Sequence, residues 1–332
     1  MRTRIRRALG LVVALVVVIA AAGWWLVGME SVPEPDLPGV IEERRTAWEK
    51  RERTWRFYRP SQLAERPAVV FVLHGSMGDG RDARGMMAYE FDRLAEAHGF
   101  LAVYPDGFDR HWNGCRAHGP YEANALDVDD VGFLRAIVGE LEGQFGVDPG
   151  RVFATGVSNG GHMAIRLALE APDFVTAVAP IVASLPSGDN LDCEPTGEPV
   201  AVVLVNGSED PMNPFEGGTV ALYGLLGNRG TVHSTQASIE YFAANAGHEG
   251  EAEIEPLPDL RQDDGSVVVR HRWEEPGRPE VTLYAVMGGG HTVPHPRMRF
   301  PRLIGRTNAD VNAAEEIWAF FERAGQASAR KP

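Results

Sequence analysis

Short apolar runs alternate with helix-like segments along most of this chain, and this alternation limits the folds that it can adopt. The runs cover residues 68–73, 100–104, 152–157, 175–183, 200–207 and 281–290. A strand that is apolar at successive positions is typical of a sheet buried on both faces. Helical segments between such strands predict an α/β fold, in which a mostly parallel central sheet carries helices on both faces. Functional sites in these folds lie at the carboxyl ends of the strands.

Three more elements are expected around this set. Residues 54–60 predict an early edge strand. An amphipathic pattern predicts a helix that begins at Asp129 or Asp130, since either carboxylate can cap the first turn. A closing helix is expected after Asn312, because Asn312 and Glu315 have the spacing of a capping box.

Residues 1–28 differ in composition from the rest. Four arginines precede an apolar run over residues 8–27, and a helix of that length spans about 30 Å, the thickness of a bilayer core. Because positive charges stay in the cytoplasm, the remainder of the chain is predicted to be exported. Two forms remain open. Small residues at 20–22 offer a cleavage site for a signal peptide, whereas Trp24 and Trp25 are typical of an uncleaved signal anchor.

The other domain boundaries follow from composition. Residues 29–52 begin with prolines and acids, which predicts a stalk or linker. One folded domain is predicted over residues 53–325, and residues 326–332 are expected to form a disordered tail.

The exported part of the chain is acidic. The whole sequence has 32 Lys and Arg against 46 Asp and Glu and a formal net charge of −14, which becomes −18 without the four N-terminal arginines. This charge repels nucleic acids and anionic lipids, so it excludes a polyanionic partner and leaves membrane contact to residues 1–28. The sequence does not predict an oligomeric state.

Cys115 and Cys193 are the two cysteines of the sequence, and both lie in segments expected to be loops. In an oxidising compartment such a pair predicts one disulfide bond. Two unpaired thiols are the alternative.

The segment Gly156-Val157-Ser158-Asn159-Gly160 joins the apolar run 152–157 to a helix-like segment. A Gly-x-Ser-x-Gly motif between a strand and a helix is the nucleophile elbow, a sharp turn that exposes the serine hydroxyl at a helix N-terminus. The alternative is a tight turn that happens to contain Ser158. The buried strand before the motif and the helix after it favour a nucleophile.

A nucleophilic serine needs a general base and a group that orients this base. His291 follows three glycines after the last apolar run. Asp210 follows the run 200–207, with Glu209 as its neighbouring alternative. The order Ser158, Asp210, His291 is the order found in α/β-hydrolases.

His291 and His295 also have a spacing that metal ligands can have. Pro294 interrupts any helix between them, and no carboxylate cluster or HExxH motif accompanies them. The sequence therefore predicts no metal, and the expected chemistry needs no cofactor.

A tetrahedral intermediate on such a serine needs hydrogen-bond donors for its oxyanion. The backbone N–H of Asn159, the residue after the nucleophile, is one candidate. The other is expected in the loop after the run 68–73, where the backbone N–H of Ser76 is the first candidate and that of Met77 the second.

Six ordered motifs carry a resemblance to a known family: LHGSMGDG, VYPDGFDRHWN, DVDDVGFL, GVSNGGHMA, NGSEDPMNPFEGG and GGGHTVP. Over roughly residues 53–325 the chain resembles the secreted polyhydroxybutyrate depolymerase-like and feruloyl esterase-like α/β-hydrolases. The resemblance implies the α/β-hydrolase fold and a Ser-His-Asp esterase whose triad is Ser158, Asp210 and His291.

The same resemblance implies a disulfide between Cys115 and Cys193. It leaves the preferred substrate open at two positions. Val293 stands before Pro294 where relatives often have Trp-Pro, and His162 stands in the elbow helix where an apolar residue is usual.

The sequence thus predicts an exported serine esterase for carboxylic esters, such as hydroxyalkanoate-oligomer, hydroxycinnamoyl or acetyl esters. Trp112 and Phe215 are expected either to line its substrate pocket or to pack in the core. An amide or peptide hydrolase with the same triad is the alternative, and a non-catalytic binding protein on this scaffold would have an incomplete triad. The length leaves no room for a polymer-adsorption domain, which favours small or oligomeric esters.

Overall fold

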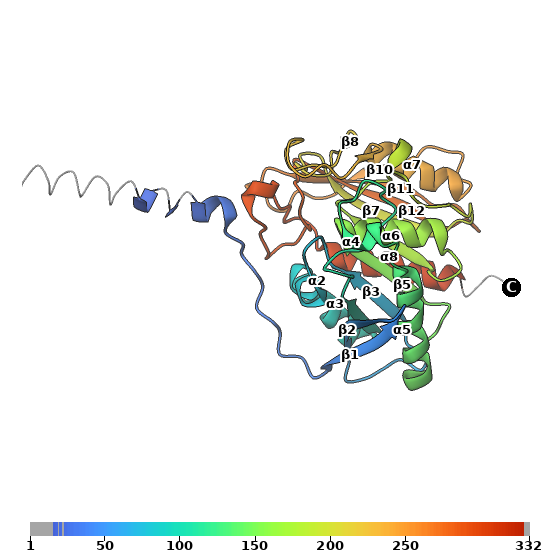
Figure 1. Cartoon of the computed structure of the whole chain (residues 1–332). Coiled ribbons are helices and arrows are strands. Elements are labelled where there is room, and N and C mark those ends of the chain that lie inside the picture. The colour runs from blue at the N-terminus through green and yellow to red at the C-terminus, as the bar shows by residue number, and fades with distance from the viewer. Residues whose placement is uncertain (1–15, 19, 22, 329–332) are drawn as a thin grey trace, which may run out of the picture.

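A computed structural model describes residues 16–18, 20–21 and 23–328 (Figure 1). Its centre is a 10-stranded sheet with the order β1-β2-β4-β3-β5-β6-β7-β12-β11-β10. The predicted apolar runs form β3 (Val69–Leu73), β4 (Leu101–Pro105), β5 (Val152–Val157), β6 (Ala177–Ile181), β7 (Ala201–Gly207) and β12 (Val281–Met287). Neighbouring strands of this set pair in parallel, which confirms the predicted mostly parallel central sheet.

Antiparallel strands extend the sheet on both sides. They are β1 (Val40–Trp48), β2 (Arg51–Arg59), β10 (Glu253–Pro256) and β11 (Val267–Trp273), and a separate short ribbon contains β8 (Gly218–Thr219) and β9 (Thr231–Val232). β2 pairs with β4, and β1 pairs along the whole of β2. The strand expected at residues 54–60 is therefore β2, but it does not form the edge of the sheet. The strands β1, β10 and β11 were not predicted.

The position of β1 corrects the stalk expected over residues 29–52. Most of its residues alternate between exposed and half-buried, as the side chains of an edge strand with one solvated face do. The charged residues of β1 therefore give this segment the composition of a solvated linker, although it forms a strand. The segment before β1 also contacts the domain, because Glu30 and Arg299 exchange two backbone hydrogen bonds of 2.9 and 3.0 Å.

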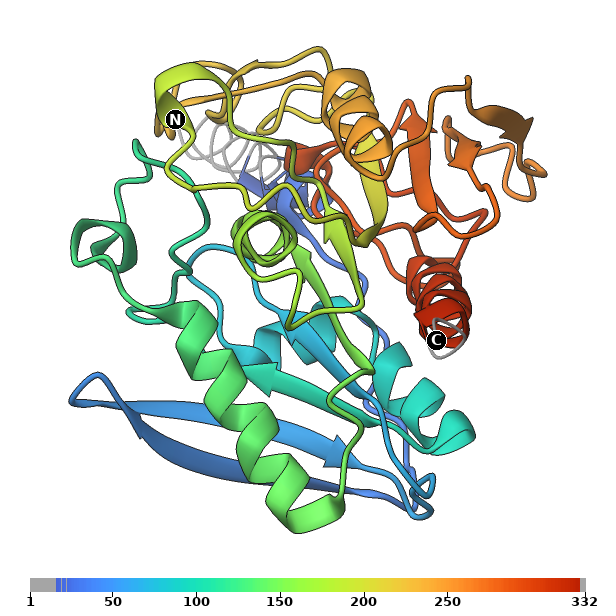
Figure 2. The same ribbon diagram turned by 90° about the vertical axis from the view of Figure 1, so that its right-hand side faces the viewer.

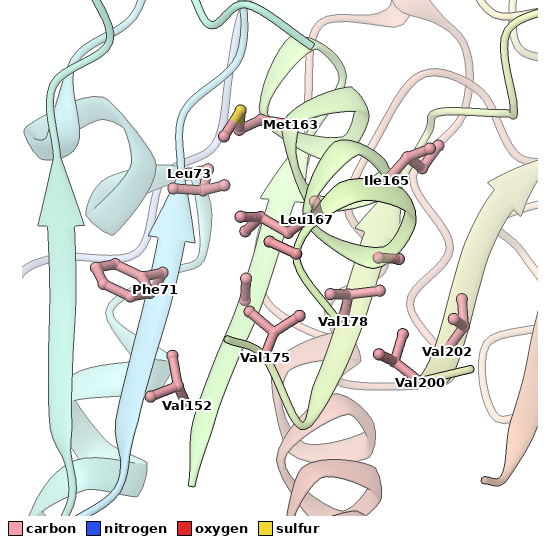
Figure 3. Packing of buried hydrophobic residues seen from close by; sticks show 14 of the residues in the cluster. Phe71, Leu73, Val152, Met163, Ile165, Leu167, Val175, Val178, Val200 and Val202 are labelled. Atoms are coloured by element: carbon pink, nitrogen blue, oxygen red, sulfur yellow. The ribbon is translucent and has the colours of Figure 1, made fainter. Parts of the chain in front are cut away.

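Helices cover both faces of the sheet (Figure 2). One face carries α5 (Asp130–Phe145), α6 (Asn159–Glu170) and α7 (Thr235–Asn245), and the other carries α2 (Gly80–Met86), α3 (Glu90–His98) and α8 (Ala313–Ser328). Side chains of the parallel strands enter the two hydrophobic clusters that these helices cover. In β3, Phe71 and Leu73 belong to the cluster under α6, which Figure 3 shows together with Leu167 of that helix.

Of the two predicted helix caps, one is formed and the other is not. Asp129 caps α5, and its carboxylate accepts a hydrogen bond of 2.7 Å from the N–H of Gly132. The helix α8 begins at Ala313, directly after Asn312 as expected. However, the side-chain oxygen of Asn312 is buried without a hydrogen-bond partner in the described part of the chain, so the capping box with Glu315 is not formed.

Cys115 and Cys193 form a disulfide bond with their Cα atoms 5.0 Å apart, so the predicted bridge is confirmed. The bond joins the long loop after β4 to the loop between β6 and β7. A backbone hydrogen bond of 3.1 Å from Asp192 to the carbonyl of Cys115 accompanies it.

Most of the expected membrane segment, namely residues 1–15, 19 and 22, lies outside the described residues. Within the residues that are described, no helix is both long enough and apolar enough to cross a bilayer. At the other terminus α8 continues to Ser328, so the first residues of the tail expected at 326–332 are helical.

The disulfide closes a loop with a sequence separation of 78 residues. A crosslink of this length is expected to stabilise the fold by about 4 kcal/mol, because it restricts the unfolded chain. We therefore expect the double variant Cys115→Ala, Cys193→Ala to lose about this much free energy of unfolding in urea denaturation. The wild-type protein with its disulfide reduced is the control and should lose a similar amount. An unchanged urea midpoint in both would contradict the prediction.

Candidate active site

Ser158 lies between the end of β5 and the first residue of α6, with φ 56° and ψ −111°. A residue with a side chain rarely adopts positive φ, and such strain persists only where the surrounding structure enforces it. The enforcing contact is the approach of α6 to β3. A Cβ atom on Gly160 would lie 2.3 Å from the carbonyl oxygen of Leu73, so only glycine fits there. The motif therefore forms the sharp strand-to-helix turn that its sequence predicts.

His291 and Asp210 are hydrogen-bonded to each other, with 2.7 Å between Nδ1 of the imidazole and Oδ2 of the carboxylate. The other carboxylate oxygen accepts backbone N–H groups from Met212 and Asn213 at 2.7 and 2.9 Å. Since an ionised carboxylate only accepts, the ring proton of His291 lies on Nδ1. Nε2 is then the basic nitrogen, and it is buried with no hydrogen-bond partner among the described residues.

Glu209, the neighbouring carboxylate, points elsewhere. It forms an ion pair with Arg306, and both side chains are more than half exposed. Only Asp210 of the two adjacent acids reaches His291, a distinction that sequence position alone could not make.

Glycine contacts also bring the acid and the base together. The loops after β7 and β12 touch where a Cβ on Gly207 would lie 2.4 Å from the carbonyl oxygens of Gly289 and Gly290. The backbone N–H of His291, the next residue, donates a hydrogen bond of 2.7 Å to the carbonyl of Ile304. Because β5, β6, β7 and β12 are parallel neighbours, the three predicted triad residues all follow strand ends at the same edge of the sheet. No hydrogen bond joins Ser158 to His291 among the described residues.

The loop after β3 runs beside the serine. A Cβ on Gly75 would lie 3.8 Å from Cβ of Ser158. The two expected donors in this loop differ, because the N–H of Met77 is already bonded to the carbonyl of Arg110 at 3.0 Å. The N–H of Ser76 has no acceptor in the described part of the chain. The N–H of Asn159 lies at the N-terminus of α6.

His74 holds this loop in place, and sequence analysis missed it. Its Nε2 accepts the N–H of Gly107 at 2.8 Å, so Nδ1 carries the proton and donates to the carbonyl of Gly75 at 2.7 Å. Burial disfavours the charged imidazolium and lowers the pKa of His74 to about 4. The neutral ring therefore connects the loop after β3 to the loop after β4. A histidine directly before the Gly-Ser pair was the only signal in the sequence.

Trp112 packs in the core and does not form a pocket wall. Its side chain is 0% exposed, and its indole N–H donates to the carbonyl of His74 at 3.1 Å. The amide side chain of Asn159 makes hydrogen bonds of 2.7 and 3.0 Å to the two backbone groups of Trp112. Phe215 is half-buried and packs against the cluster under α6 and α7. The structure thus favours packing for Trp112, and a pocket wall at Phe215 stays a prediction.

His162 and His295 are both buried. His162 is buried on α6, and desolvation, with smaller contributions from Arg116 and His291, lowers its pKa well below the usual range. His295 contacts Glu90 at 3.3 Å through Nε2 and accepts two backbone N–H groups at Nδ1. The rings of His291 and His295 thus face different carboxylates, unlike a pair of ligands to one metal.

The neutral state of His74 predicts a pH-dependent stability. Its pKa is about 4 in the folded protein against 6.5 in a model peptide, so the stabilisation is complete above pH 6.5 and is lost as the pH falls toward 4. We expect the difference in unfolding free energy between wild type and His74→Gln to shrink by about 2–3 kcal/mol between pH 7 and pH 4.5. Urea denaturation at both pH values measures it, and a difference independent of pH would contradict it.

The two adjacent carboxylates give a matched pair of variants. Asp210→Asn should lower kcat for a p-nitrophenyl ester by about 10³–10⁴, because the amide no longer holds the required tautomer of His291. Glu209→Gln should change kcat by less than about fivefold, since an exposed ion pair contributes at most ~1 kcal/mol. Equal losses in the two variants would remove Asp210 from the assigned role.

The chain is similar in sequence to proteins that are named as esterases. A sequence model of the family described as "Putative esterase" matches residues 47–188. "Putative esterase NocK" of Nocardia uniformis is 30% identical over an alignment of 346 residues, which covers 96% of this chain and 98% of that protein. Feruloyl esterase C of Emericella nidulans is 33% identical over 130 residues, which cover 39% of this chain and 43% of that enzyme.

A solved structure shows the same fold. The acetyl xylan esterase from Aspergillus awamori superposes with a TM-score of 0.50 at 16% identity, covering 88% of this chain and 98% of that one. The sheet, the helices on both faces and this likeness confirm the predicted α/β-hydrolase fold. The chain belongs to the esterase family that this sequence model and these relatives represent, and it is a carboxylic ester hydrolase.

Proposed function

We propose that the protein is an exported serine esterase whose triad is Ser158, His291 and Asp210. The observation that carries the proposal is the buried hydrogen bond of 2.7 Å between His291 and Asp210, which directs Nε2 of the neutral imidazole away from the carboxylate as the free basic nitrogen. The strained turn at Ser158 supports it, because a serine in this backbone conformation projects from the strand-to-helix turn.

In the proposed reaction, Oγ of Ser158 attacks the ester carbonyl carbon while Nε2 of His291 takes the hydroxyl proton. The N–H groups of Ser76 and Asn159 donate to the oxyanion of the tetrahedral intermediate. The intermediate collapses to an acyl-enzyme, and His291 returns the proton to the departing alcohol. A water molecule, deprotonated by the same imidazole, then attacks the acyl carbon and releases the acid and Ser158.

The proposed substrates are small or oligomeric carboxylic esters. Hydroxycinnamoyl and acetyl esters are supported by relatives that are named feruloyl esterase and acetylxylan esterase. Hydroxyalkanoate oligomers are the third class, supported by the motifs shared with depolymerase-like enzymes.

The proposed location is outside the cytoplasm. The arginines and apolar run of residues 1–27 have the composition of an export signal, and the disulfide between Cys115 and Cys193 fits an oxidising compartment. Whether the signal is cleaved or remains as an anchor, the catalytic domain would lie on the far side of the membrane.

The first test is hydrolysis of p-nitrophenyl acetate and p-nitrophenyl butyrate by the full chain and by Ser158→Ala. We expect the variant to lose activity by about 10³ or more, because it lacks the nucleophile. p-Nitroacetanilide, the amide counterpart of the acetate ester, should be hydrolysed far more slowly. Equal ester activity in both proteins would show that Ser158 is not the nucleophile. A higher rate on the anilide would identify an amidase instead.

A further inference from the structure

Tyr121 lies beside the loop that carries Ser76. Its hydroxyl is 3.0 Å from Oγ of Ser76 and accepts a hydrogen bond of 2.8 Å from Nε of Arg229. Because Arg229 can only donate, the hydroxyl proton of Tyr121 is available to Ser76 or to a ligand. A guanidinium and a phenol therefore converge next to the backbone N–H proposed to bind the oxyanion.

A second guanidinium lies behind this phenol. Arg116 is 2% exposed, and its Cζ atom is 5.6 Å from the centre of the Tyr121 ring. Its Nε is buried and has no hydrogen-bond partner in the described part of the chain. Burial lowers the pKa of Arg116, with only Tyr121 acting in the opposite direction. A buried guanidinium without a carboxylate is costly, since its charge has left water without a counterion.

Most described arginines of this acidic protein form ion pairs with carboxylates, as the buried Arg53 does with Asp130 at 2.7 Å. Arg116 and Arg229 form no ion pair among the described residues. The charges of these two arginines affect the pKa of Tyr121. Burial by itself raises the pKa of its phenol, but the charges of Arg116 and Arg229 and the hydrogen bonds outweigh burial and lower this pKa. The potential beside the oxyanion loop is therefore positive, in a chain of net charge −14.

The groups of this cluster are held in place by neighbours. The ring of His111 stacks on Tyr121 with centroids 4.1 Å apart and an interplanar angle of 19°. Arg229 is fixed by a hydrogen bond of 2.7 Å from Nη1 to the carbonyl of Gly227. Donors that are positioned before binding lose little entropy when a ligand arrives.

We propose that Arg229, Tyr121 and Arg116 form an anion-binding subsite beside the oxyanion loop, and that the esterase prefers esters that carry a carboxylate. The half-buried Arg229 and the Tyr121 hydroxyl contact this carboxylate, while the buried Arg116 acts on it through its charge. A guanidinium suits this ligand because its N–H groups match the two carboxylate oxygens. The inference rests on the proposed function, since the subsite is defined relative to the same oxyanion loop.

The test compares pairs of esters that differ in one negative charge. Mono-p-nitrophenyl succinate and p-nitrophenyl butyrate form a pair with the charge in the acyl group. 4-Acetoxybenzoate and methyl 4-acetoxybenzoate form a pair with the charge in the alcohol. The charge preference is kcat/KM for the charged ester divided by kcat/KM for the neutral one. Rates with Ser158→Ala are subtracted, because the succinate also hydrolyses spontaneously.

Three variants of the full chain complete the design. Arg229→Gln removes the charge that contacts the ligand, and Arg229→Lys retains a positive charge without the planar donor group. Arg151→Gln is the matched control, because Arg151 precedes β5 at the opposite end of the strand from Ser158 and forms no ion pair among the described residues. It changes the net charge of the protein by the same amount as Arg229→Gln.

We expect a charge preference above one in at least one pair. It should fall by about tenfold or more in Arg229→Gln, as hydrogen bonds to charged groups contribute ~1.5–3 kcal/mol. Arg229→Lys should recover part of it, and Arg151→Gln should leave it within about twofold. A preference at or below one in both pairs, or one that Arg229→Gln does not change, would overturn the subsite. Failure of the triad itself is recognised separately, since the neutral esters would then not be hydrolysed above the Ser158→Ala rate.

Discussion

The approach of main chain to main chain at the carboxyl edge of the sheet is the constraint on which the rest of the site depends. The helix α6 meets the end of β3 at Gly160, where a Cβ atom would lie 2.3 Å from a carbonyl oxygen. The loops after β7 and β12 meet in the same way at Gly207. These contacts exclude side chains, and they force Ser158 into a backbone conformation that costs free energy in isolation. The parallel strands behind them, apolar on both faces, supply the stability that maintains this strain.

Around this edge, neutral buried groups hold the polar ones in position. His74 and the amide of Asn159 connect the loops after β3 and β4 to the start of α6. Burial keeps His74 and His162 uncharged, so neither adds a formal charge near the serine. Asp210 is already saturated on one oxygen by two backbone N–H groups, which leaves the other for His291. Donors and acceptors positioned in this way need little reorganisation as charge develops on a substrate.

The sequence predicted the parts of the molecule that depend on local pattern. Continuous apolar runs identified the six parallel strands, and Gly-x-Ser-x-Gly identified the turn at Ser158, because each feature is encoded within a few residues. The edge strands β1 and β10 were not predicted. One face of β1 is solvated and every residue of β10 is exposed, so both have the composition of a linker. Contacts between segments that are distant in the sequence were not predicted either. Nothing local distinguishes Asp210 from Glu209, and no motif indicates that Tyr121 meets Arg229 across the fold.

The two outer strands have a further physical consequence. An open sheet edge presents unpaired N–H and C=O groups, and such an edge can recruit a strand from another chain and start aggregation. Here β1 carries consecutive charges from Glu42 to Arg45, and β10 alternates glutamates with apolar residues and ends at Pro256, which lacks an N–H donor. Charged side chains, which would have to leave water, and a missing donor thus protect the two ends of a wide sheet from unwanted strand addition.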